Sequence, residues 1–487
     1  MRALILCAVA TCALLGCGSE PPAPNTELSA EPGEELTGGE TTVFDTSPNA
    51  FSLSARNMTP ERRSTFFVGN SFFKENWIIA PSSTDGRDGL GPLYNARSCS
   101  GCHLMDGRGT PPEDTTEPLS SVLIRLSVAG KTEHGAPAPE PIYGGQLQPK
   151  AIPGITPEGD AFVQYEEVAG QFDDGDTYQL RRPTYSFVLG RGDMQPGAMT
   201  SPRVAPQMIG LGLLEAIAEA DVLALADPND QDQDGISGRP NMVWDVVLQK
   251  LTLGRFGWKS NQPDLIQQTA GAFLGDMGIS TSLFSTQDCT MAETDCAVAP
   301  NGGSPECSEH IRDAVTFYSK TLAPPARRDW QEPEVLQGKQ LFATAGCGKC
   351  HTAVYKTGTL EGFPELSNQT IRPYTDLLLH DMGAELADGR PDSELTKDLL
   401  GGVTEVRTAA ERIARTEIHR ANRDASRENY IANSDIILGY ERIATLDTRT
   451  CPVCLALDGT VSELGEIMPS HPNCRCAVAP WFGQQIE

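Results

Sequence analysis

Residues 99–103 read Cys-Ser-Gly-Cys-His, and this short stretch decides which fold the chain can have. The same spacing returns at residues 347–351 as Cys-Gly-Lys-Cys-His. Two thiols about one helical turn apart can add to the two vinyl groups of one porphyrin, and the next imidazole can then reach the iron. A redox dithiol needs no following histidine, and a structural zinc site needs a second ligand pair nearby. We therefore expect two covalently bound c-type haems, held by Cys99, Cys102 and His103 and by Cys347, Cys350 and His351.

The residues before each C-x-x-C-H segment are spaced as in helices. In "NMTPERRSTFFVGNSFF" (57–73), Thr59 can cap a helix that starts at Pro60. Phe66, Phe67 and Phe73 would form its apolar side. In "EPEVLQGKQLFATAGCGKCH" (332–351), apolar residues recur at helical spacing. We expect a mainly α protein with long loops, made of two cytochrome c-like haem modules and followed by a small α+β zinc-type segment.

The N-terminus predicts export. Residues 3–15, "ALILCAVATCALL", follow Arg2 and are too short to span a membrane as a mature helix. The run ends in "LLGC", which resembles the lipobox of bacterial lipoproteins, so residues 1–17 are predicted as a signal peptide with lipidation at Cys17. An ordinary secretory signal is the alternative. We expect a periplasmic or cell-surface protein that meets the membrane through its lipid anchor only.

Composition predicts a flexible stalk over residues 18–45, which are rich in Pro, Gly and Glu. The whole chain of 487 residues has 65 acidic and 38 basic residues and a formal charge of −27. Such a field repels phosphate backbones, so we expect no nucleic-acid partner. A basic redox partner protein would suit it better.

Several longer motifs resemble one family. They are "GNSFFKENWIIAPSSTDGRDGLGPLYNARSCSGCHLMDGRG" (69–109), "DQDGISGRPN" (232–241), "LGRFGWK" (253–259) and "LLLHDMGAELADGRPD" (377–392). Together they resemble the bacterial di-haem oxidoreductase family, also labelled thiol oxidoreductase or peroxidase, over about residues 50–392. The resemblance implies that one haem passes electrons while the other offers an iron position to peroxide or a similar small acceptor. His103 and His351 would be the proximal ligands. A pure electron-transfer cytochrome is the alternative.

The resemblance also suggests further site residues. Trp258 is the candidate for a tryptophan that lies between the haems in di-haem peroxidases, although a buried structural tryptophan would fit as well. His380 and Met382 are candidates for a catalytic or electron-transfer role near the second haem. Residues 46–329 would form the first module and residues 330–392 the second.

An acidic loop predicts calcium. Asp230, Asp232 and Asp234 alternate before Gly235, as in the first half of a calcium-binding loop. The twelfth position is Asn241 and not the glutamate of an EF-hand, so a solvated acidic turn is the alternative. Further along, Cys289 and Cys296 are close enough for a disulfide, although Cys307 could pair with either of them.

The resemblance stops near residue 392, before the family's closing segments, so the second module looks truncated. Residues 393–402 would be a junction. Residues 403–487 contain "IARTEIHRA" (413–421), "LDTRTCPVCLALDG" (446–459) and "HPNCRC" (471–476), and resemble Mu-type phage head morphogenesis proteins. A natural fusion and an artefact of joining both remain open, as does a capsid-assembly role. We expect zinc here, with a disulfide framework as the alternative. The candidate zinc ligands are Cys451, Cys454, His471, Cys474 and Cys476.

Overall fold

The computed structural model describes residues 29–84, 86–113, 115–171, 177–231, 237–344, 346–381, 439–443, 461–463 and 477–481. Its composition corrects the expected fold class. Among the residues that the structure describes, helices make up 24% and strands 23%, so the fold is not mainly α. The prediction failed because it extended the helical spacing next to the two haem motifs to segments that have a different periodicity.

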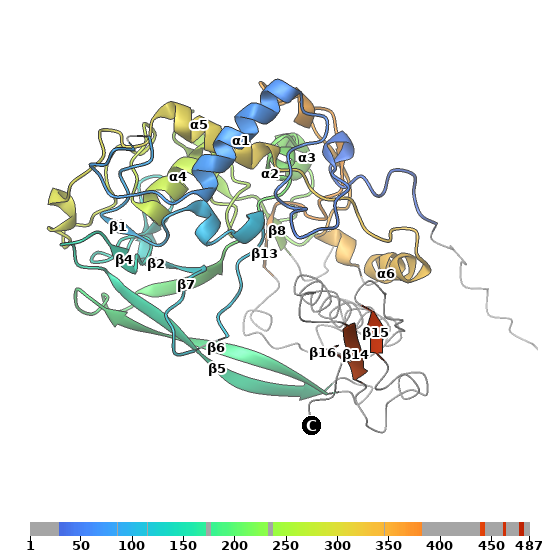
Figure 1. The fold of residues 1–487 in the computed structure, drawn as a ribbon, viewed down its shortest axis with the longest axis horizontal. Coiled ribbons are helices and arrows are strands. Elements are labelled where there is room, and N and C mark those ends of the chain that lie inside the picture. The colour runs from blue at the N-terminus through green and yellow to red at the C-terminus, as the bar shows by residue number, and fades with distance from the viewer. Residues whose placement is uncertain are drawn as a thin grey trace, which may run out of the picture.

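The main helices lie together in one layer of the body (Figure 1). It consists of α1 (Pro60–Lys74), α4 (Leu265–Met277) and α5 (Glu309–Thr321), with the short α2 (Leu211–Glu215) and α3 (Glu219–Leu223) nearby. Thr59 caps α1 and Pro60 is its first residue, which confirms that prediction. Phe66 and Phe73 are buried with Tyr318 of α5, but Phe67 is 62% exposed, so its assignment to the apolar side was wrong. Helix α6 (Pro333–Thr344) precedes the second motif as expected.

The strands that the prediction missed lie mainly between residues 122 and 204. Strand β2 (Val122–Lys131) pairs with β3 (Pro137–Ala138) and β7 (Met199–Val204) in the order β3-β2-β7. Val122, Ile124 and Leu126 are buried while the residues between them are half-buried. This alternation with period two is typical of a strand with one buried face. This alternation can be read from the sequence.

A long antiparallel hairpin extends from this sheet region (Figure 1). It is formed by β5 (Gly159–Gln171) and β6 (Thr177–Leu189), which pair from Gly159 opposite Leu189 to Gln171 opposite Thr177. Its base packs into a small apolar core with β2, in which Ala161 and Val163 are buried.

The remaining strands form small antiparallel sheets. The two-stranded pairs are β1 (Leu93–Tyr94) with β4 (Lys150–Ala151), β8 (Ser237–Arg239) with β13 (Leu379–Asp381), β9 (Met242–Asp245) with β10 (Lys250–Leu253), and β11 (Tyr355–Lys356) with β12 (Thr370–Ile371). In the C-terminal segment, β15 (Val461–Glu463), β14 (Gly439–Ile443) and β16 (Ala477–Trp481) form a three-stranded sheet in that order. Short 3-10 helices are η1 (Gly39–Thr41), η2 (Cys99–Gly101), η3 (Leu104–Asp106), η4 (Cys296–Val298), η5 (Cys347–Lys349) and η6 (Pro364–Leu366).

The described part of the expected stalk is folded, which corrects the prediction there. From residue 31 onward the chain folds onto the body, where Val43 bridges to Pro325. Glu34 is 2% exposed and forms ion pairs with Arg327 and Lys339. Long-range partners of this kind can order a polar segment that composition alone assigns to disorder. Residues 18–28 lie outside the described residues, as does Cys17.

Two further findings concern the predicted disulfide and membrane-spanning helices. Cys289 and Cys296 form a disulfide, and Cys307 is buried as a free thiol. In the described part of the chain, no helix has the length and apolar character needed to cross a membrane.

Candidate functional site

The two C-x-x-C-H segments have the same backbone geometry. Each forms one 3-10 turn, η2 and η5, and each histidine N–H donates to the carbonyl of the first cysteine. The distances are 3.0 Å from His103 N to Cys99 O and 2.9 Å from His351 N to Cys347 O. None of the four motif cysteines is in a disulfide. The thiols of each pair are thus outside disulfides and one turn apart, as thioether bonds to one porphyrin require.

The two imidazoles are oriented in the same way. His103 Nδ1 lies 2.7 Å from Pro206 O, and His351 Nδ1 lies 2.9 Å from Tyr374 O. A carbonyl oxygen can only accept, so Nδ1 must carry the proton and Nε2 keeps its lone pair. A second hydrogen bond of this kind is the usual way in which proteins fix a metal-binding histidine.

An aromatic side chain from the preceding helix packs on each imidazole. The ring centroid of Phe73, on α1, is 6.3 Å from that of His103. The ring of Phe342, on α6, is 5.9 Å from that of His351. The helix, the turn and the carbonyl acceptor thus recur around both motifs, although the sequence separations differ.

The surroundings of the first motif favour neutral ligands. Burial and the nearby charge of Asp276 raise the pKa of Cys102 to about 11. Burial lowers the pKa of His103, although the hydrogen bond to Pro206 opposes this. Asp276 is at the end of α4 and accepts from Gln146 Nε2 at 2.9 Å. A neutral imidazole is the form that binds a metal.

Apolar side chains lie open beside His103. Leu104 is 67% exposed, Met105 is 48% exposed and Trp258 is 51% exposed. Trp258 Nε1 donates to Val204 O at 2.7 Å, two residues before the carbonyl that holds His103. Trp258 is thus near the first motif and is not a buried structural tryptophan. Large exposed apolar groups of this kind are typical of a surface that a ligand covers. Together with the free thiols and the available Nε2, they fit a haem.

His380 lies next to the second motif. Its Nε2 lies 2.6 Å from the carboxylate of Asp376, and its Nδ1 lies 3.9 Å from Cys350 Sγ. Strand β13 carries His380 opposite Gly238 of β8. The structure therefore places His380 beside Cys350 of the second motif. Met382 lies outside the described residues.

One connected segment runs between the two motifs. It starts at Pro206, which holds His103, and continues through α2 to Ala216 and Ile217. There Gly358 N donates to Ala216 O at 2.7 Å, and Ile217 bridges to Thr357. Thr357 follows β11, a few residues after His351. The two motifs are thus joined by a short path of covalent and hydrogen bonds.

The predicted calcium and zinc sites gain no support. Asp230 lies in a turn where Gln231 N donates to both carboxylate oxygens of Asp227, at 2.9 and 2.8 Å. Asp232, Asp234 and all five candidate zinc ligands lie outside the described residues. Among the residues that the structure describes, no group of three or more His, Cys, Asp or Glu is placed to hold a metal ion.

Comparison with family models decides the classification. The model for "Di-haem oxidoreductase, putative peroxidase" matches residues 33–399. The chain belongs to the di-haem oxidoreductase family. This match begins earlier than the resemblance seen in the motifs. A second model, "Phage Mu protein F like protein", matches residues 379–479. Neither the curated proteins nor the solved structures that were compared give a significant match.

Sequence reasoning missed several groups that complete this di-haem oxidoreductase site. Pro206 and Tyr374 act through backbone carbonyls, which have no side-chain signature. Asp276 comes from α4, far from the first motif in sequence. Asp376 could have been found, because it stands four residues before His380.

Proposed function

We propose that this chain is a peroxidase-like enzyme that moves electrons between two covalently bound c-type haems. The observation that supports this best is the repeated geometry of His103 and His351, each with Nδ1 bonded to a backbone carbonyl and Nε2 available. The haems would supply one-electron redox chemistry and an iron position for a peroxide. Two electrons and two protons convert hydrogen peroxide to two molecules of water.

Backbone carbonyls and aromatic side chains of the protein would hold the two haem ligands in place. Pro206 and Tyr374 fix the two imidazoles, and Phe73 and Phe342 pack against them. The segment from Pro206 to Ile217 links the carbonyl at His103 to residues 357–358 near His351. Trp258, half-exposed beside the first motif, is the candidate side chain at the gap between haems. His380 and Asp376 lie beside Cys350, where they can hold a proton near the second haem.

The setting proposed from the sequence is extracytoplasmic. Covalent haem attachment is a property of exported proteins, and residues 1–17 carry the features of a lipoprotein signal with Cys17 as the lipidated residue. A redox partner protein would deliver the electrons. The segment at 379–479 that matches the phage Mu F model includes His380, which lies beside Cys350.

The test is peroxide consumption by the haem-loaded chain with a chemical reductant. We expect turnover together with a high-spin ferric signal in the visible spectrum from one haem. Replacing Trp258 with Phe should slow electron transfer between haems but keep both haems attached. Two low-spin haems with no peroxide turnover would instead favour the pure electron-transfer cytochrome.

A further inference from the structure

Basic side chains surround the first C-x-x-C-H turn. Lys74 ends α1, and its carbonyl accepts from Ser100 Oγ within the turn at 2.9 Å. Arg97 stands two residues before Cys99. Arg108 donates to the side chain of Gln207, next to the carbonyl that holds His103, at 3.0 Å. Lys150 is close enough for its charge to act on Cys102. We call these four residues, Lys74, Arg97, Arg108 and Lys150, the basic rim.

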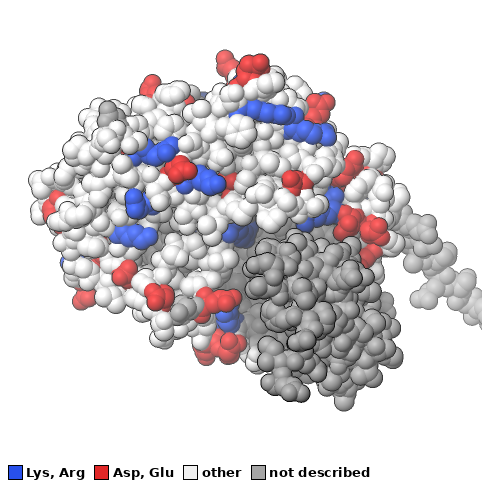
Figure 2. All heavy atoms as spheres, in the orientation of Figure 1, with Lys and Arg blue, Asp and Glu red and all other residues white. Residues whose placement is uncertain are grey.

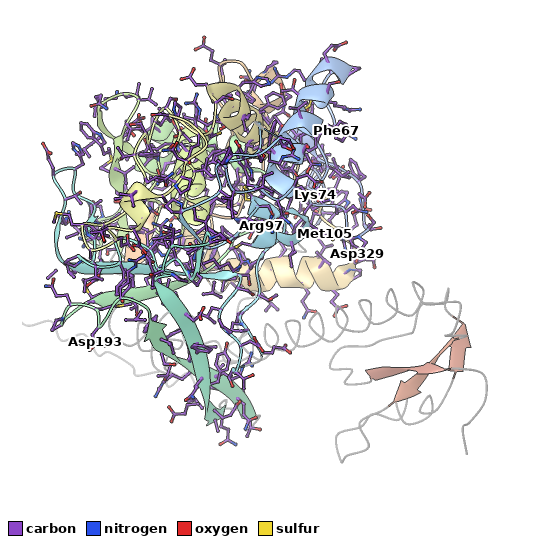
Figure 3. The ribbon with its side chains drawn as sticks, turned by 60° about the vertical axis from the view of Figure 1, so that its left-hand side comes forward. Phe67, Lys74, Arg97, Met105, Asp193 and Asp329 are labelled. Carbon is purple, nitrogen blue, oxygen red and sulfur yellow. A yellow bond between two sulfur atoms is a disulfide. The ribbon has the colours of Figure 1, made fainter. Side chains whose placement is uncertain are left out.

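The basic rim faces solvent, and the structure shows no ion pair between it and a described carboxylate. All four side chains are exposed. Figure 3 shows Lys74 and Arg97 close to Met105 at the C-terminal end of α1. Figure 2 shows Lys and Arg side chains, with Asp and Glu side chains among them, over the face of the molecule that carries α1.

The acidic groups near the rim mostly do not reach the surface. Asp106 is 5% exposed and accepts hydrogen bonds from Ser52 and Tyr318. Asp276 is bonded to Gln146. Glu75 is the exposed carboxylate next to Lys74. The local surface is therefore positive, although the whole chain has a formal charge of −27.

The haem would supply an apolar centre inside this rim, because it would cover the exposed Leu104 and Met105 described above. Leu104 and Met105 directly follow His103 and are 67% and 48% exposed. Charged groups around a small apolar spot are typical of a transient protein interface, where the charges steer the encounter and the apolar centre makes the contact. Electron-transfer complexes are small and short-lived interfaces of this kind.

We propose that the basic rim docks an acidic electron-transfer protein, which gives one electron to the ferric haem at Cys99–His103 and is itself oxidised by one electron. The inference rests on the proposed function. It contradicts the expectation from total charge, because a partner at contact distance meets the four local cations, while distant carboxylates are screened within about 10 Å at ordinary salt.

The experiment uses the full haem-loaded chain and reduced flavodoxin, a strongly acidic one-electron carrier, as the probe. The test variant is Lys74→Glu with Arg97→Glu. The control is Arg63→Glu with Lys131→Glu, two exposed positions outside the rim that make the same change in net charge. Stopped-flow absorbance gives the second-order rate of haem reduction, and titration calorimetry gives the affinity for oxidised flavodoxin. Hexaammineruthenium(II), a small cation, serves as a second reductant.

We expect the flavodoxin rate for the unchanged chain to fall as salt is raised. The rim variant should lose about tenfold in rate and affinity, while the control variant stays within about twofold. The ruthenium rate should not fall in the rim variant. Equal losses in both variants, or a wild-type rate that rises with salt, would overturn the proposal. A chain without covalent haem would refute the proposed function alone, because calorimetry still measures docking.

Discussion

At the scale of single residues, His103 and His351 each have Nδ1 hydrogen-bonded to a backbone carbonyl, but the two carbonyls come from different parts of the fold. His103 finds its carbonyl 103 residues later in the chain and His351 finds its own 23 residues later. The motif predicts both histidines as haem ligands, because thiol and imidazole spacing is a local property. It could not predict the carbonyl partners, since any residue supplies a carbonyl and only the fold decides which one is near.

The buried pair of Asp106 and Tyr318 gives one prediction. Tyr318 is fully buried, and its hydroxyl donates to Asp106 Oδ1 at 2.7 Å, while Ser52 Oγ donates to Oδ2 at 2.6 Å. Replacing Tyr318 with Phe leaves the covered carboxylate short of a donor, so we expect a loss of about 1–3 kcal/mol in the free energy of unfolding. Urea unfolding measures this. Tyr165→Phe, which removes only a bond to the carbonyl of Pro112, should cost less.

Glu158 gives a prediction on pH. Burial and the neighbouring carboxylate of Glu293 raise its pKa from 4.5 to about 10. Above pH 4.5 the unfolded chain releases this proton while the folded chain keeps it, so the raised pKa removes stability as pH rises toward 10. Glu158→Gln cannot titrate. Relative to the unchanged protein, it should gain up to about 1.4 kcal/mol per pH unit.

Urea unfolding at pH 5 and pH 8 measures this difference. The control is Glu167→Gln on the exposed part of β5, which should show no such trend. Parallel pH profiles for Glu158→Gln and the unchanged protein would show that Glu158 is ionised in the fold.

At the scale of elements, the sequence analysis predicted the helices next to the motifs but missed the sheets. Thr59 and Pro60 specify the start of α1 by local chemistry. Strand β2 was also visible in its alternation, but the long β5–β6 hairpin is mostly exposed and lacks a continuous apolar face. The 29–45 segment was assigned to disorder because its partners lie near residues 325–327, which local composition does not include.

The crossing of α1 and α5 gives a matched pair of glycine variants. A Cβ at Gly69 would lie 2.1 Å from the carbonyl oxygen of Ala314, so Gly69→Ala must push the helices apart. We expect a loss of about 1–3 kcal/mol in unfolding free energy. In α6, a Cβ at Gly338 would meet nothing within 4 Å, and Gly338→Ala should stabilise by up to about 1 kcal/mol. Thermal unfolding of both variants measures this; equal shifts would contradict the tight crossing.

At the scale of the whole molecule, one segment joins the two C-x-x-C-H turns, which have the same backbone geometry. The run from Pro206 to Ile217 contacts His103 at one end and the 357–358 strand end near His351 at the other. The motifs and their order identified the family from sequence alone, and the family match over residues 33–399 confirms it. The partner expected from total charge stays a prediction, because total charge averages over surfaces that differ locally.

The most direct test of the account is the number of covalent haems per chain, measured by pyridine haemochrome absorbance and intact mass on protein from a host that matures c-type cytochromes. Two haems are predicted for the unchanged chain. Cys99→Ala with Cys102→Ala should remove one of them, and Cys347→Ala with Cys350→Ala should remove the other. One haem or none on the unchanged chain would contradict the central claim that both C-x-x-C-H turns are haem sites.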